Sequence, residues 1–164
     1  MRFMMIVYPK DYLTAKAGWV PDLTDIEDSR KFHEEMGAAG VLVALDGLTP
    51  PATMSARVTR ENGKVKVTDG PFTEAKEVVG GYYIIEVKSR EEAIQWASRI
   101  PRKDGEMVVE VRRFFDMSDF AVPVQDKLTE LEEQQAAKGI KQAGQQLKNF
   151  PRYVEFRSCR STIG

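Results

Sequence analysis

The residues best suited to acid–base chemistry are a carboxylate at a turn and a lone histidine. Asp69 begins the run Asp69-Gly70-Pro71-Phe72, between a strand-like segment and a short stretch of mixed charge. Burial beside the ring of Phe72, Tyr82 or Tyr83 would raise the pKa of this carboxylate and suit it to donate or accept protons. His33, the only histidine in the sequence, is the second candidate for proton transfer.

Both residues also have a purely structural interpretation, which the residue types alone favour. Asp, Gly and Pro in succession are typical of a tight turn, because Asp accepts a local backbone hydrogen bond, Gly frees the backbone and Pro fixes φ. A histidine at the solvent edge of a helix needs no catalytic role. The acid–base hypothesis therefore depends on whether Asp69 is buried in a cleft.

A ligand pocket is expected between the sheet and the helices, close to this turn. The candidates to line it are aromatic and polar residues at strand ends and beside the turn: Tyr8, Asp46, Arg57, Phe72, Glu74 and Tyr83. Arg57 could meet an anionic ligand, although charged residues on a hairpin are usually just solvated. With one cysteine, one histidine, no clustered acids and no glycine-rich phosphate loop, the sequence predicts neither a metal site nor a cofactor.

The composition narrows the class of protein. The 164 residues carry a net charge of −1, so no basic patch for nucleic acid or for an anionic membrane is expected. The first apolar run covers only residues 3–7, which is too short for a signal peptide or a membrane span. Cys159 is the only cysteine, so disulfides within the chain are excluded and a cytoplasmic location is expected.

The hydrophobic pattern predicts the order β, α, β, hairpin, β, α, β. Apolar or alternating runs predict strands over residues 2–8, 41–45, 81–87 and 107–115. Capping boxes at Thr24 to Glu27 and at Ser89 to Glu92 predict helices over residues 25–39 and 89–100. Asn62-Gly63 suits a type I′ turn, which predicts a hairpin over residues 56–68 with Val58 opposite Val67.

Two βα units meeting in one sheet predict an α+β, ferredoxin-like fold with an inserted β-hairpin. Helices would then cover one face of the sheet, while apolar side chains also occupy the other face. A second copy is the simplest cover for that face, so a homodimer packed sheet to sheet is expected. The composition changes after residue 120, and apolar spacing from Ala136 to Phe150 predicts a C-terminal helical arm within residues 121–164, with a loosely ordered tail as the alternative.

The run DGPFTEAKEVVGGYYIIEVKSREEAIQWASRIP, together with the upstream GVLVALDGL and the later DGEMVVEVRRFFDMSDF, resembles the DGPF-domain branch of the YCII-related proteins. The resemblance covers residues 2–120 and implies a dimeric α+β barrel. It also implies bacterial proteins without a settled activity, often encoded near extracytoplasmic-function sigma factors. In smaller relatives a histidine and an acid in the cleft are suspected of catalysis, which would make His33 and either Asp46 or Asp69 the corresponding candidates.

Two functions remain open at this point. The first is a homodimer that binds a small molecule in a cleft near the DGPF turn, in one form a cofactor-free enzyme that uses a carboxylate as acid or base. The second is a non-catalytic regulatory or interaction module that acts with a sigma factor or another protein through the helical arm. A deep cleft with a buried Asp69 would favour the enzyme.

Overall fold

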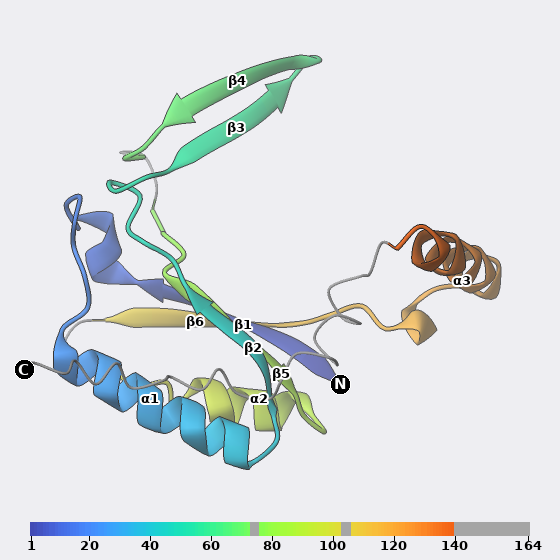
Figure 1. Ribbon diagram of the computed structural model, residues 1–164, viewed down its shortest axis with the longest axis horizontal. Coiled ribbons are helices and arrows are strands. Elements are labelled where there is room, and N and C mark those ends of the chain that lie inside the picture. Colours follow the sequence, from blue (N-terminus) through green and yellow to red (C-terminus); the bar gives the residue numbers. More distant parts are fainter. Residues whose placement is uncertain (73–75, 103–105, 140–164) are drawn as a thin grey trace, which may run out of the picture. The chain divides into compact units, whose positions relative to one another are not determined.

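The computed structural model describes residues 1–72, 76–102 and 106–139. It divides into two compact units, Met1–Phe115 and Asp116–Gly164. The first unit contains a four-stranded sheet with the order β2-β5-β1-β6 (Figure 1). The strands are β1 (Arg2–Pro9), β2 (Leu42–Gly47), β5 (Gly81–Glu86) and β6 (Met107–Arg113). All neighbouring strands are antiparallel, which confirms the predicted ferredoxin-like connectivity.

Two helices, α1 (Leu23–Ala38) and α2 (Arg90–Ala97), lie on the same face of this sheet (Figure 1). Because side chains alternate along a strand, Phe3, Met5 and Ile85 point towards the helices and are buried. They form the core together with buried helix residues, among them Phe32, Met36, Ala93 and Ala97. The core thus lies between the sheet and one helical layer.

The start of α1 differs from the predicted one. Asp22 is the N-cap residue, and its Oδ1 atom accepts a hydrogen bond of 2.7 Å from the backbone N–H of Asp25. Thr24 therefore lies inside the first turn, and the predicted capping box at Thr24 is wrong because an acid two residues earlier already accepts from the free N–H group. The predicted cap of α2 is confirmed, since Ser89 Oγ accepts from the N–H of Glu92 at 3.2 Å.

The inserted hairpin forms a separate two-stranded sheet. Strands β3 (Ala56–Glu61) and β4 (Lys64–Asp69) pair with Val58 opposite Val67 and Glu61 opposite Lys64, as predicted. Asn62 has φ 49° and Gly63 has φ 77°, the positive values that a type I′ turn requires. The local turn chemistry therefore determined the register of this hairpin.

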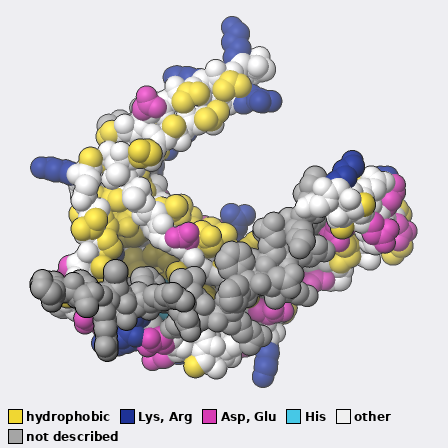
Figure 2. Space-filling model, in the orientation of Figure 1, with side chains coloured by type: hydrophobic (Ala, Val, Ile, Leu, Met, Phe, Trp, Pro, Cys, Tyr) yellow, Lys and Arg dark blue, Asp and Glu magenta, His cyan; other side chains and the backbone are white. Residues whose placement is uncertain are grey.

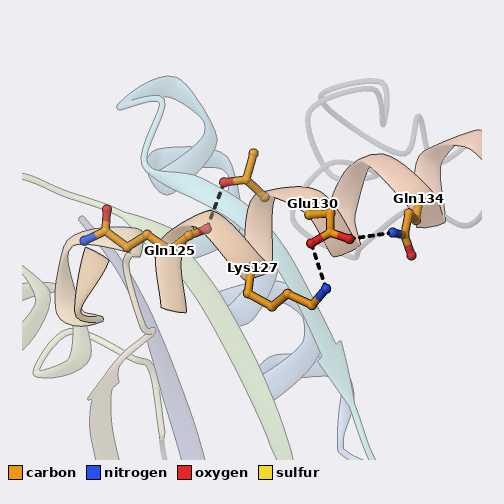
Figure 3. Close-up of polar contacts among 5 residues, drawn as sticks. Gln125, Lys127, Glu130 and Gln134 are labelled. Carbon is orange, nitrogen blue, oxygen red and sulfur yellow. Dashed lines mark hydrogen bonds and ion pairs between the residues drawn. The ribbon is translucent and has the colours of Figure 1, made fainter. Parts of the chain in front are cut away.

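The second unit contains the helix α3 (Val122–Ala137) after a short 3₁₀ turn, η2 (Met117–Asp119). Its polar contacts are local: Glu130 accepts from Lys127 Nζ at 2.7 Å and from Gln134 Nε2 at 3.0 Å (Figure 3). A C-terminal helix is thus present, whereas the predicted seam beyond residue 139 lies outside the described residues. Within the described part of the chain, no helix has the length and apolar character needed to cross a membrane.

Candidate functional site

A cavity of about 380 Å³ lies at the base of the hairpin, next to the DGPF turn. We call it the hairpin-base cavity. Its walls come from the loop after β2, from β3 and from the segment between the turn and β5. The lining residues are Leu48, Thr49, Pro51, Met54, Ser55, Arg57, Phe72, Glu77, Val78 and Val79. Two of the ligand residues predicted from the sequence, Arg57 and Phe72, therefore meet in one cavity.

Backbone contacts hold the walls of this cavity in place. The N–H of Gly70 donates to the carbonyl oxygen of Ser55 at 2.9 Å, and Ser55 Oγ donates to the carbonyl oxygen of Pro51 at 2.5 Å. A Cβ atom at Gly70 would lie 2.4 Å from that same Pro51 oxygen, so only glycine allows the turn to approach the loop so closely. On the other side, the N–H of Leu48 donates to the carbonyl oxygen of Gly80 at 2.8 Å.

Arg57 and Phe72, which both line the cavity, are in direct contact with each other. The guanidinium carbon of Arg57 lies 4.3 Å from the centre of the Phe72 ring, within the range of a cation–π interaction. Glu77 supplies a carboxylate to the same cavity. Among the described residues, no side-chain hydrogen bond or ion pair joins Arg57 or Glu77 to another residue. The cavity is therefore lined by one guanidinium and one carboxylate that do not form an ion pair with each other.

A second cavity of about 500 Å³ lies on the side of the loop Tyr12 to Ala17. It shares Pro51, Phe72 and Val78 with the hairpin-base cavity. Its charged lining residue is Lys16, which is exposed. Phe72 contributes to the walls of both cavities, so its side chain is the central apolar element of this region.

The two acids near the DGPF turn have different outcomes. Asp69 is exposed at the end of β4, opposite Ala56, and lines neither cavity. The burial that acid–base chemistry at Asp69 would need is therefore absent from this chain, and its catalytic role stays a prediction. Glu74 lies outside the described residues. Sequence reasoning missed Glu77, whose position directly before the apolar pair Val78-Val79 was the available signal.

Tyr8 and Asp46 lie on the face of the sheet that the helices leave open. Side chains two positions apart on a strand share a face, so Tyr8 lies on the same face as Ile6. Tyr82 of β5 pairs with Ile6 on one side and with Asp46 on the other, which places Asp46 on this face as well. The hydroxyl group of Tyr8 donates to Glu110 Oε2 at 3.1 Å, and burial together with this contact raises the pKa of Tyr8. Asp46 is exposed, and its Oδ1 accepts from the N–H of Gly47 at 2.8 Å.

Tyr83 points to the opposite face, where it meets His33. His33 Nε2 lies 3.2 Å from the Tyr83 hydroxyl group, and the ring of Phe32 packs edge to face on Tyr83. Tyr83 is only 9% exposed, and burial raises its pKa to about 12. Burial also lowers the pKa of His33, so both groups are neutral at pH 7. Tyr8 and Tyr83 thus lie on opposite faces of the sheet, and their place in a ligand site stays a prediction.

Metal binding has no support in the described ranges, which contain no group of three His, Cys, Asp or Glu side chains arranged to hold an ion. The polar groups at the hairpin-base cavity can instead bind an organic ligand directly through charge and hydrogen bonds. The His33–Tyr83 pair provides a neutral hydrogen bond between α1 and β5.

Comparison with known proteins identifies the family of this sequence. The sequence model of the YCII-related domain matches residues 1–118. A protein described only as uncharacterised, from Rhizobium meliloti (strain 1021), is 32% identical over 75 residues, which are 46% of this chain and 57% of the relative. The chain thus spans little more than half the length of that relative. Since the domain match covers most of the sequence, the chain belongs to the YCII-related family.

Proposed function

We propose that this protein binds a small molecule in the hairpin-base cavity. The observation that carries the proposal is the Arg57–Phe72 contact, which places a cation on the wall of a mostly apolar cavity, with no ion pair to any residue that the structure describes. A few convergent polar groups in an apolar concavity are typical of small-molecule sites. The DGPF run also supports a place in the DGPF branch of the family, with a cytoplasmic location in a bacterium.

In its catalytic form, the proposal is a cofactor-free enzyme that uses a carboxylate to take a proton from the ligand and return it. Glu77 lines the cavity and is the carboxylate best placed for this step. Asp69 remains the alternative, because it begins the turn that carries Phe72. His33 contacts Tyr83 on the helix-covered face, so its catalytic role would be a separate one.

We propose further that the protein is a homodimer. Apolar side chains on the open face of the sheet, including Met4, Ile6, Ile84 and Val108, point away from α1 and α2. The hairpin adds Val58, Val65 and Val67, which share one face and are 65%, 56% and 61% exposed. Figure 2 shows hydrophobic side chains along the hairpin and around its base. A second copy would remove these apolar surfaces from water.

The second candidate function is an interaction module without catalysis. Exposed apolar residues on the hairpin and on α3 favour it, the latter being Val122, Val124 and Leu131. A protein partner such as a sigma factor would bind through residues 121–164 and leave the hairpin-base cavity without a function. Ligand binding therefore separates the two proposals.

A thermal-shift screen of the full chain against a library of small metabolites tests the first proposal. A compound that raises the melting temperature of the wild type should have no effect on Phe72→Ala, because Phe72 forms the apolar wall. Phe115→Ala is the matched control, since Phe115 is an exposed phenylalanine outside both cavities. Circular dichroism checks that both variants are folded.

The same compound then identifies the carboxylate. Glu77→Gln should weaken binding, whereas Asp69→Asn should leave it unchanged if Glu77 is the group in contact with the ligand. If Asp69→Asn loses binding and Glu77→Gln does not, Asp69 is the carboxylate that contacts the ligand. Binding that survives in folded Phe72→Ala would remove the hairpin-base cavity from consideration.

A further inference from the structure

We infer that the ligand of the hairpin-base cavity is of the amino-acid class: a carboxylate and an ammonium group on a small apolar body. This inference rests on the proposed function and specifies its ligand. It comes from three features of one cavity: the guanidinium of Arg57, the carboxylate of Glu77, neither in an ion pair with a described residue, and the apolar side chains of the lining.

Arg57 selects the anionic group. Its guanidinium lies over the Phe72 ring, and this stacking restricts the side chain while leaving the N–H groups at the guanidinium edge free to donate. A planar guanidinium can donate two parallel hydrogen bonds to one carboxylate, and such charge-assisted bonds are stronger than bonds between neutral groups. No carboxylate of the described residues forms an ion pair with Arg57, so its guanidinium can pair with a ligand carboxylate.

Glu77 selects the second group. An ionised carboxylate only accepts hydrogen bonds, and no donor from the described residues pairs with Glu77. A ligand that carries only negative charge would be attracted by Arg57 and repelled by Glu77 in the same small cavity. A ligand with an ammonium group satisfies both charges, so an amino acid fits better than a phosphate or a simple acid.

The remaining walls select the body of the ligand. Most of the lining consists of apolar side chains: Leu48, Pro51, Met54, Phe72, Val78 and Val79. A volume of about 380 Å³ is at the lower end of the usual range for ligand pockets. The cavity therefore suits a single small molecule with an apolar or aromatic side chain.

Three matched probes test each group separately by isothermal titration calorimetry with the full chain. Phenylalanine has both charges, 3-phenylpropanoate has only the carboxylate and phenethylamine has only the ammonium group. Phenylalanine should bind most tightly, and loss of either charged group should weaken binding roughly tenfold or more, the effect of one charge-assisted hydrogen bond.

Variants then connect each group to its residue. Arg57→Gln should weaken phenylalanine and 3-phenylpropanoate and leave phenethylamine unchanged, whereas Glu77→Gln should weaken phenylalanine and phenethylamine and leave 3-phenylpropanoate no weaker. Arg60→Gln is the matched control, because Arg60 lies on the same strand but does not line the cavity. Thermal unfolding confirms that all three variants are folded.

The outcomes separate this inference from the proposed function. Absence of binding by all three probes, or equal effects of Arg57→Gln and Arg60→Gln, would overturn the ligand class. An uncharged compound that binds in a Phe72-dependent manner would leave the proposed function intact and also overturn the ligand class. If folded Phe72→Ala binds every compound like the wild type, the cavity itself is not the site and both proposals fall.

Discussion

The contact between His33 and Tyr83 has a clear role in stability at the scale of single residues. Tyr83 lies under α1 with its ring against Phe32, so its hydroxyl group has little access to water. His33 Nε2 provides a hydrogen-bond partner at 3.2 Å. A buried hydroxyl group without a partner would cost about 1–3 kcal/mol. The lone histidine is therefore explained by packing, whether or not it also takes part in catalysis.

The lowered pKa of His33 predicts a pH dependence of folding. As pH falls below the ordinary histidine pKa of 6.5, the unfolded chain binds a proton that the folded chain does not bind. The free energy of unfolding should therefore fall as pH decreases from about 6.5, until the lower pKa of the folded state is reached. His33→Gln should remove this loss, because His33 is the only histidine. Urea unfolding of both proteins at pH 7.5 and 5.5 measures the difference.

Carboxylates also begin to titrate near the lower of these pH values, but they are the same in both proteins and cancel in the comparison. Tyr83→Phe is the control for the loss of the hydrogen bond, since it keeps the histidine and its titration. An equal loss of stability in the wild type and in His33→Gln would contradict the assignment of the pH dependence to His33.

At the scale of secondary-structure elements, capping residues decide where the helices begin. Both α1 and α2 start with a short polar side chain that accepts from the N–H three residues later, Asp22 in α1 and Ser89 in α2. In α1 the sequence pattern predicted Thr24 as the capping residue, whereas Asp22 is the N-cap in the structure. A negative charge at this position also interacts favourably with the positive end of the helix dipole.

This choice predicts unequal effects of two similar substitutions. Asp22→Ala should lower the free energy of unfolding by about 1 kcal/mol, because the N–H of Asp25 loses its acceptor. Thr24→Ala should change it by less than about 0.5 kcal/mol, since Thr24 lies within the helix and alanine has the higher helix propensity. Chemical denaturation measures both values. If Thr24→Ala lowered the free energy of unfolding more than Asp22→Ala does, Thr24 would be the capping residue, as the sequence pattern predicted.

The hairpin has one apolar and one polar face, and its two-stranded sheet has no second layer of its own to cover the apolar face. Its apolar face contains Val58, Val65 and Val67, and the opposite face contains Thr59, Glu61 and Lys66. Two-stranded sheets alone are only marginally stable in water, so the packing of the hairpin base against the Pro51 loop matters for its position. That packing depends on the hydrogen bond from the N–H of Gly70 to the carbonyl oxygen of Ser55.

At the scale of the whole molecule, the uncovered face of the sheet predicts self-association. The wild type should sediment as a dimer at micromolar concentration, because a second copy would bury the apolar residues of that face. Ile6→Glu places a charge on the open face and should yield monomers. Ile94→Glu is the matched control, because Ile94 is exposed on α2, on the other side of the sheet.

Analytical ultracentrifugation distinguishes the possible results. A monomeric wild type would refute the homodimer. Dissociation by Ile94→Glu but not by Ile6→Glu would move the interface to the helical face. In either case ligand binding tests the hairpin-base cavity separately.

Local patterns in the sequence determined most of the fold. Alternating apolar residues predicted the strands, Asn62-Gly63 predicted the turn and register of the hairpin, and Ser89 predicted the start of α2. These features depend on residues close together in the chain, so a local argument is sufficient. The order of the elements then left few topologies, and the ferredoxin-like one is confirmed.

Only the tertiary structure decided which functional candidates meet. Arg57 and Phe72 come together because the DGPF turn folds back on the Pro51 loop, and Glu77 joins them from beyond the turn. Tyr8 and Tyr83 lie on opposite faces of the sheet. His33, 50 positions before Tyr83 in the sequence, lies within hydrogen-bond distance of its hydroxyl group. Such contacts depend on how distant segments pack, and side-chain types alone carry no information on that packing. For this reason the sequence identified the DGPF turn, and the fold identified the cavity beside it.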